Sequence, residues 1–521
     1  MVKSHGIGRR GKGDTHASQR ATVGNDTYKD ALMSASGIAK LTGNTNALNQ
    51  DQTHAYMMFT PKYGHNHNDA LSLSMFSYNV ELLPDIGYTH TRNRSWATST
   101  LGHNTVTVNQ KNSQSKDGGN ILRYVPSENT VGVIRAYDQI AYNEIDVYDR
   151  EVVYVPMNEK GPEGYVLDIF RVSGGKTHEY SLNMGADYDY DLTSDIKWQY
   201  SSETMLPEGV KYVKPTVESS AGNASGHYPA YMFVEDVQSA ELKNQPYKIS
   251  YVTTEGFYTG TGLNILGAAD SGEIFIGKAP SMRATRASMA NDLNDQCDDY
   301  YMDKMIYRRE GDDLNSLFVT VMEPFSKKYE SQIHSVEKLS IKGLNEFDAV
   351  IKVTGEGFVD YIFSAYDEDM SVNVDGIHFE GQFGFVRIRD NEVVFMQGLN
   401  AKTFTFDGAS ISENRSISGV ITDILLKTTG DEMNGFVVNG KPDEALKGQY
   451  IIVKHPDGTT NGYLIDRIVE NNSTYFVDIG DVEPGFAFNG VDSTKMIYYP
   501  HIERQGIIEY MIDDTSYYSR N

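Results

Sequence analysis

The chain has 521 residues, of which 46 are Lys or Arg and 71 are Asp or Glu, so its formal net charge is -25 at pH 7. A chain of this length exceeds what one hydrophobic core usually serves, so two or three domains are expected. The negative charge disfavours general binding to nucleic acid or to an anionic membrane, because its long-range field repels both. The only cysteine, Cys297, excludes an intrachain disulfide.

Residues 1–50 are predicted to form an N-terminal arm with one helix. Residues 1–27 are polar and Gly-rich, and from Lys3 to Lys29 the chain holds six basic residues and two acidic ones. This part is either a flexible tail or an arm that touches an anionic ligand. The apolar spacing of residues 28–41 predicts the helix. No apolar segment of a signal peptide and no run of about 18 apolar residues is visible, so no membrane span is expected.

From about Ala55 onward the chain changes to short β-branched and aromatic runs separated by Gly, Asn, Asp and Pro. Examples are NTVTVNQ, EVVYVPM, GYVLDIFRV, YKISYVTT and SLFVTVM. Their regular spacing predicts a mainly β fold, with a large antiparallel β-sandwich over residues 51–415. The strands after a polar stretch near Ser412 predict a smaller β-barrel-like or sandwich module over residues 416–521.

Four of the thirteen histidines lie between residues 63 and 108, namely His65, His67, His90 and His103. In an extended strand His65 and His67 would point to one face, because side chains alternate. Two imidazoles and one carboxylate are a usual ligand set for zinc, and His67, Asp85 and His103 are the candidates. Spacing alone leaves open hydrogen-bonded core histidines and a turn aspartate, because ligands from three separate segments form no short pattern.

Ordered sequence blocks extend this observation over roughly residues 50–185. They are GHNHNDALSL, ELLPDIGY, WATSTLGHNTVTV, YDREVVYVP and YVLDIFRVSGGKTHEYSLN. In this order the blocks resemble the C-terminal region of the heparinase II/III family of polysaccharide lyases. Several blocks in one order are much more specific than any single block.

The resemblance implies an N-terminal α/α toroid followed by antiparallel β-sheets, and cleavage of uronic-acid glycosides by β-elimination. It also implies that His67, Asp85 and His103 hold a zinc ion, that His65 is the catalytic histidine of the sandwich side, and that the protein is periplasmic or extracellular. We expect the zinc to be structural, because it would hold His65 in place. The sequence departs from the family in lacking room for the toroid and in having Asn183 where relatives commonly carry His.

Four further side chains are candidates for the substrate groove. Tyr88 could supply a catalytic phenol or be an aromatic core residue. Arg92 and Arg94 would give local positive charge that matches carboxylate or sulfate, with surface salt bridges as the alternative. Trp96 could stack on a sugar ring or be buried under the sandwich.

The leading hypothesis is a lyase of acidic polysaccharide that works with a toroid domain or with a second copy of the chain. The alternative from another class is a non-catalytic carbohydrate-binding or structural β-protein. A third reading, a zinc hydrolase, needs a carboxylate base beside the metal, for which Asp69 is the nearest candidate. No nucleic-acid or membrane partner is expected.

Overall fold

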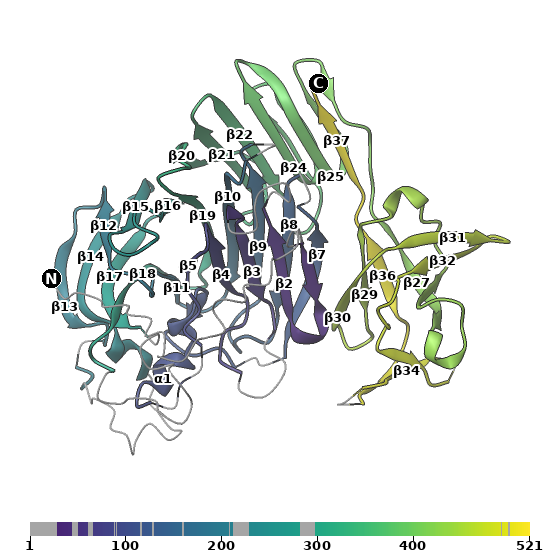
Figure 1. The fold of residues 1–521 in the computed structure, drawn as a ribbon, viewed down its shortest axis with the longest axis horizontal. Helices are drawn as coiled ribbons and strands as arrows, with labels where there is room; N and C mark the ends of the chain where they lie inside the picture. Colours follow the sequence, from purple (N-terminus) through teal and green to yellow (C-terminus); the bar gives the residue numbers. More distant parts are fainter. Residues whose placement is uncertain are drawn as a thin grey trace.

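The structure is a computed structural model of the chain. It describes residues 29–43, 51–60, 66–87, 89, 91–114, 117–127, 130–158, 161–207, 209–211, 229–281, 297–490, 492–498 and 501–520. These residues form mainly antiparallel β-strands and contain one α-helix, α1 (Arg94–Ala97), which confirms the predicted fold class (Figure 1). Among them, no helix has the length and apolar character needed to cross a bilayer.

An eight-stranded central sheet forms the middle of the molecule (Figure 1). In spatial order its strands are β12 (Tyr190–Ser194), β15 (Pro246–Thr253), β16 (Gly262–Ala268), β19 (Asn315–Phe325), β10 (Gly164–Ser173), β9 (Val147–Pro156), β8 (Gly132–Asp138) and β7 (Gly119–Val125). Almost every residue of β9 and β10 is buried, because other layers cover both faces. Side chains alternate between the faces, so Val152 and Tyr154 enter one core while Val153 and Val155 enter another.

Two sheets cover the first face of the central sheet. The N-terminal sheet contains β1 (Ala31–Met33), β2 (Ile38–Thr42), β3 (His54–Met58), β4 (Ser72–Ser77) and β5 (Val80–Leu83). The lateral sheet contains, in spatial order, β13 (Gln199–Thr204), β14 (Glu235–Leu242), β17 (Gly272–Pro280), β18 (Tyr301–Glu310), β11 (Thr177–Asn183) and β6 (Val106–Val108). Buried side chains of all three sheets form one continuous core.

An outer sheet covers the second face of the central sheet. Its strands are β20 (Ile333–Lys338), β21 (Ala349–Gly355), β22 (Phe358–Ser364), β24 (Ile377–Arg389), β25 (Glu392–Phe406) and β26 (Ala409–Ser410), with β23 (Met370–Val374) on β24 and β37 (Thr515–Ser519) on β25. The last strand of the chain therefore belongs to this sheet.

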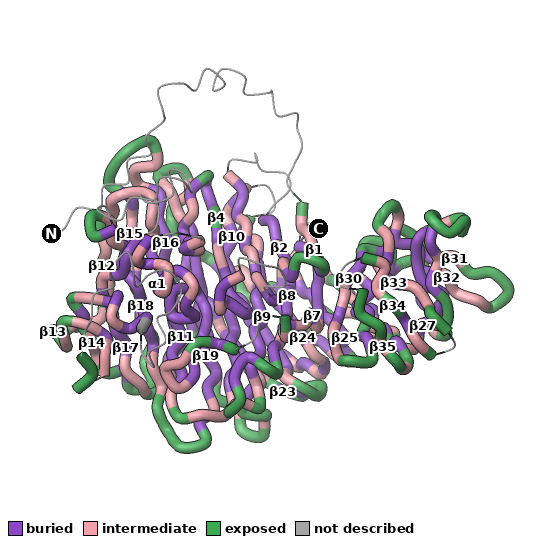
Figure 2. Tube along the Cα trace, turned by 90° about the horizontal axis from the view of Figure 1, so that it is seen from below, coloured by how far each residue is buried: buried purple, intermediate pink, exposed green. Residues whose placement is uncertain are grey.

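Between β26 and β37 the chain forms a C-terminal module with a core of its own, which stands to one side of the main body in Figure 2. One sheet contains β30 (Thr460–Leu464), β29 (Tyr450–Lys454), β36 (Glu509–Ile512), β27 (Ile417–Leu425), β28 (Gly435–Val438), β32 (Thr474–Asp478) and β31 (Arg467–Asn471), and a second contains β33 (Phe486–Phe488), β34 (Ser493–Met496) and β35 (Glu503–Gln505). The described strands form no closed barrel. Ile417 pairs with Ile512, so the module begins and ends at one place.

The helix predicted over residues 28–41 is wrong. Its described part forms β1 and β2, joined by the short 3-10 helix η2 (Ser34–Ser36). Gly37 has a φ of 69°, and a Cβ there would lie 1.8 Å from the Thr60 carbonyl oxygen, so only glycine fits this turn. In β2, Ala39 and Leu41 are buried and alternate with half-buried Ile38 and Lys40, which is the period of two of a strand. The basic arm of residues 1–27 lies outside the described residues.

Candidate metal centre

A cluster of His and Asp side chains lies at one end of the N-terminal sheet. His67 and Asp69 precede β4, and Asp85 follows β5. Because β4 and β5 are antiparallel neighbours, the start of one strand lies beside the end of the other. His103 comes from the turn after the 3-10 helix η4 (Thr100–Gly102), on the way to β6. His67 itself lies in a loop, not in the strand expected from the sequence.

Of the three side chains predicted as metal ligands, His103 lies close to each of the other two. His103 Nε2 lies 3.1 Å from His67 Nδ1 and 3.3 Å from Asp85 Oδ1. Two donor atoms on a tetrahedral zinc ion, each about 2.1 Å from it, lie roughly 3.4 Å apart. The spacing of these donor atoms therefore fits a shared cation.

The hydrogen bond of His103 Nδ1, the ring nitrogen that points away from the cluster, indicates which of the two nitrogens carries the proton. His103 Nδ1 lies 2.7 Å from the Ser99 carbonyl oxygen, which can only accept, so Nδ1 carries a proton. In the neutral ring Nε2 then has a lone pair that points to the Asp85 carboxylate. Nε2 can use that lone pair to accept a hydrogen bond from His67 Nδ1 or to bind a metal ion. A ligand histidine usually has such a second hydrogen bond to a backbone carbonyl.

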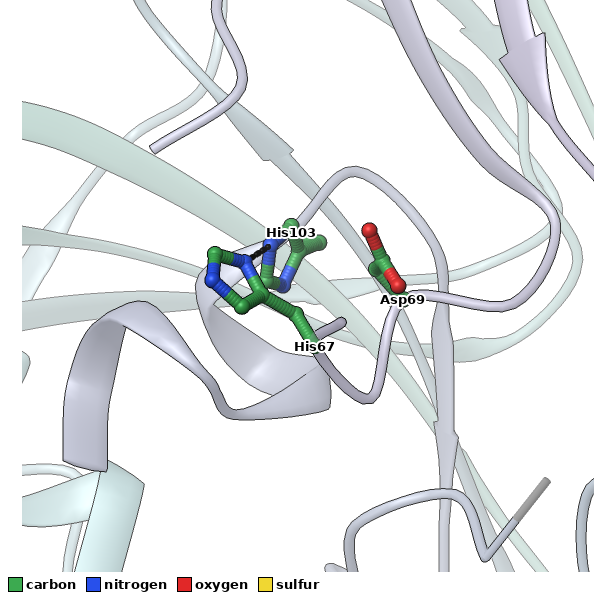
Figure 3. A group of neighbouring side chains, drawn as sticks. All are labelled: His67, Asp69 and His103. Carbon is green, nitrogen blue, oxygen red and sulfur yellow. Dashed lines mark hydrogen bonds between the residues drawn. The ribbon is translucent and has the colours of Figure 1, made fainter. Parts of the chain in front are cut away.

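Asp69 joins the cluster as an additional carboxylate. Potential ligand atoms of His67, Asp69 and His103 all lie within 4.8 Å of one another, and Figure 3 shows the two rings side by side with the carboxylate next to them. Asp69 is buried, and its Oδ1 accepts no hydrogen bond from the described residues. Burial raises the pKa of the Asp69 carboxyl; His103 opposes this rise and Asp85 adds to it. Among the sequence hypotheses Asp69 appears only as the base of a hydrolase, because in a loop its spacing from His67 does not predict on which side it lies.

The predicted catalytic residues His65 and Tyr88 lie outside the described residues, so their roles stay predictions. Arg92 forms an ion pair with Asp298, with 2.5 Å between Nη2 and Oδ2. This is the salt bridge that the sequence offered as the alternative to substrate binding. Arg94 begins α1 and is half-buried.

Trp96 is fully buried, and its Nε1 donates to the Pro280 carbonyl oxygen at 3.1 Å. The Trp96 ring lies 6.1 Å from the ring of Phe233, centroid to centroid, and belongs to a buried cluster that includes Phe275 and Ile306 of the lateral sheet. The prediction that Trp96 stacks on a sugar is therefore wrong, because neither face of the ring is accessible. Burial, the alternative, is what the structure shows.

Behind the cluster lies a lysine that the sequence did not single out. Lys304, on β18, is fully buried, and its Nζ donates to Asn183 Oδ1 at 2.8 Å and to the His103 carbonyl oxygen at 3.2 Å. Burial lowers the pKa of its ammonium group well below the ordinary value. Within the strand YMDKMIYRRE nothing distinguishes this lysine from a surface residue.

Residues 25–204 match the sequence family described as heparinase II/III-like, C-terminal, and this range contains the whole cluster. The match confirms the resemblance predicted from the sequence. A comparison with curated proteins gives no match.

Two solved structures are similar to part of the chain. One is a heparan sulfate lyase, HepC from Pedobacter heparinus, with 14% identity over 65% of this chain and 42% of that one, and a TM-score of 0.43. The other is a heparinase III gene product, with 16% identity over 63% of this chain and 41% of that one, and a TM-score of 0.39. The chain spans about two fifths of the length of these structures.

Proposed function

Because residues 25–204 match the heparinase II/III-like C-terminal family, we propose that the chain is the β-sheet part of a polysaccharide lyase. Its substrate is an acidic polysaccharide that contains uronic acid, of the glycosaminoglycan or alginate type, cleaved by β-elimination. The observation that supports this most directly is that His103 lies beside both His67 and Asp85 inside the matched segment, with Asp69 near the two histidines.

β-Elimination defines the groups that the groove must present. A base removes the C5 proton, the C4–O4 bond breaks as the C4–C5 double bond forms, and an acid protonates the leaving O4. Positive charge or hydrogen-bond donors must also offset the charge that develops on the C5 carboxylate. We assign His65 as the base or the carboxylate partner, since histidine suits either task near neutral pH. Tyr88 is the candidate phenol.

The proposed cofactor is a structural zinc ion held by His67, Asp85 and His103, with Asp69 or water as the remaining ligand. This donor set of imidazole nitrogens and carboxylate oxygens suits zinc. When bound, the ion would join the segment before β4 to the segments after β5 and η4. Because His65 is two residues from His67, this joining would restrict where His65 can lie.

A lyase groove needs a second wall, which in the heparinase II/III family is the helical toroid. A toroid domain or a second copy of the chain is the proposed source of that wall. Acid or base assistance from one side chain is typically worth ~100- to 10,000-fold in rate. The chain tested without a second wall should therefore show weak elimination or none.

Elimination is measured as the growth of ultraviolet absorbance from unsaturated uronates. The substrates are heparan sulfate, chondroitin sulfate, hyaluronan and alginate, each tested with the chain alone and with a toroid domain added in cis or in trans. We expect turnover of at least one substrate when the toroid is present, lost in His65→Ala. The matched control is His334→Ala, which changes an exposed histidine on the outer sheet.

Turnover that survives His65→Ala would contradict the assigned mechanism. If the chain shows no elimination either alone or with the toroid domain, but binds one of the polysaccharides, the result would favour the non-catalytic carbohydrate-binding protein.

A further inference from the structure

One buried amide joins two of the segments that form the cluster. Asn183, at the end of β11, donates from Nδ2 to the Gly102 carbonyl oxygen at 2.8 Å and to the Pro84 carbonyl oxygen at 3.3 Å. Gly102 immediately precedes His103, and Pro84 immediately precedes Asp85. A single side chain is thus hydrogen-bonded to the backbone next to both residues.

Lys304 holds the other end of this amide. It lies opposite Asn183 in the pairing of β11 with β18, and its Nζ contacts Asn183 Oδ1 and the His103 carbonyl oxygen. The carbonyl oxygens of Gly102 and Pro84 can only accept, so the amide nitrogen must face them and the amide oxygen faces Lys304 Nζ, which donates to it. Both side chains are fully buried, so water does not compete for these hydrogen bonds.

A second amide reinforces the same arrangement. Asn104 follows His103 and donates from Nδ2 to the carbonyl oxygens of Pro84 at 3.0 Å and Leu73 at 2.8 Å. Its Oδ1 accepts from the Asn183 backbone N–H at 2.7 Å. The end of β5 and the turn after η4 are therefore connected through side chains that start from the lateral sheet and from the turn itself.

We propose that Asn183, held by Lys304, is a positioning residue that sets the separation of Asp85 from His103 and thereby the affinity and geometry of the metal centre. The part that concerns metal rests on the proposed function. The part that concerns the two backbone segments stands without a metal. Removing the amide leaves the Gly102 carbonyl without its Asn183 donor, so both segments gain freedom to move apart.

The first measurement is hydrogen–deuterium exchange of the metal-free protein. We compare wild type with Asn183→Ala, and with Lys304→Met as a second variant should Asn183→Ala not fold. The matched control is Asn264→Ala, which removes a buried amide of the central sheet whose partners are Glu323 and Ser331. We expect faster exchange in residues 84–87 and 99–105 than the control shows. Equal exchange in these segments for variant and control would overturn the proposal.

The second measurement is titration of the metal-free proteins with Zn²⁺ and Co²⁺. Loss of a group that orients a ligand typically costs about 10- to 100-fold in metal affinity. We expect this loss in Asn183→Ala, with shifted Co²⁺ d–d bands, and wild-type behaviour in Asn264→Ala. Unchanged affinity in Asn183→Ala beside a binding wild type would overturn the proposal. A wild type that binds neither metal would remove the proposed centre, and the exchange data alone would then decide the positioning role.

Discussion

Buried histidines in this chain meet two different environments. His103 faces a carboxylate, whereas the hydrogen-bond partners of His178 on β11 are neutral and the charged group that acts on it is Arg309. His178 Nε2 lies 2.6 Å from the Gly174 carbonyl oxygen, and Nδ1 lies 2.9 Å from Ser316 Oγ. The carbonyl requires a proton on Nε2, and the Ser316 hydroxyl can donate to Nδ1 of the neutral ring. Burial lowers the pKa of His178 to about 4.

This lowered pKa predicts acid sensitivity. Between about pH 6.5 and pH 4 the unfolded chain binds a proton at His178 that the folded chain does not, so the free energy of unfolding falls as the pH falls. The contribution of His178 to the free energy of unfolding is fully present above pH 6.5. Below that pH it falls by at most about 1.4 kcal/mol per pH unit. Urea unfolding of chelated protein between pH 7 and pH 4.5 should give a smaller slope for His178→Gln than for wild type. Equal slopes in wild type and His178→Gln would contradict the assignment.

The sequence identified the ligand types of the candidate centre but not the groups around them. His67, Asp85 and His103 stand out as residues because imidazole and carboxylate side chains are recognisable metal donors. Asn183 and Lys304 act through backbone carbonyls that come near only when β11 pairs with β18. Their contribution is a property of the pairing, and no local pattern of residue types encodes it.

The β9–β10 hairpin carries a buried ion pair that reaches toward the same cluster. Arg150 donates to the two carboxylate oxygens of Asp168 at 2.8 and 2.6 Å. Its Nη1 donates to the carbonyl oxygens of Leu71 at 2.5 Å and Asn104 at 2.6 Å. The pair therefore connects the central sheet to the start of β4 and to the segment before β6.

Arg150→Met should be strongly destabilising. It leaves the charge of Asp168 buried with Tyr180 as its remaining side-chain donor, and breaking a buried pair in this way costs about 3–5 kcal/mol. The measurement is the free energy of unfolding in urea. As a control, Lys176→Met breaks the exposed pair with Asp312 and should have no measurable effect, because solvent screens it. Similar losses in both variants would contradict the distinction.

The sequence predicted the strands of the sandwich, but it could not show that the segment predicted as an N-terminal helix is made of strands. Long β-branched runs such as EVVYVP predict strands by themselves, because their side chains suit a pleated surface on either face. Residues 28–41 are short and Ala-rich, so periods of two and of 3.6 fit them about equally. Pairing of β2 with β3 decides between the two periods, and that pairing is not local.

At the scale of the whole molecule, the C-terminal module has its own core, and its strand β29 also contacts the main body, where Ile452 joins the core shared by the central, N-terminal and lateral sheets. The Thr460 backbone N–H donates to Asn120 Oδ1 at 3.0 Å, and the rings of Tyr124 and Tyr450 lie 4.5 Å apart. The candidate metal centre lies in the main body, remote in sequence from the module core. Loss of metal should therefore destabilise one part of the chain more than the other.

Purified wild type should contain close to one zinc ion per chain, and His103→Ala should contain much less. Chelation should lower the melting temperature of the main body, because a ligand that binds only the folded state stabilises it. The transition of the module should shift little. Calorimetry with and without chelator measures this, with His103→Ala as the variant that chelation should leave unchanged. Equal zinc in both proteins would remove His103 from the centre.

The insertion of the module between β26 and β37 lowers the entropic cost of pairing β37 with β25 in the outer sheet. Without a folded module, pairing β37 with β25 would close a loop of about 100 residues, whereas the pairing of Ile417 with Ile512 reduces the free segments to about eight residues. Since the cost of closure grows with the logarithm of loop length, a module that folds first lowers that cost by about 2 kcal/mol. The folded module thus holds the last strand, β37, close to the edge of β25 with which it pairs.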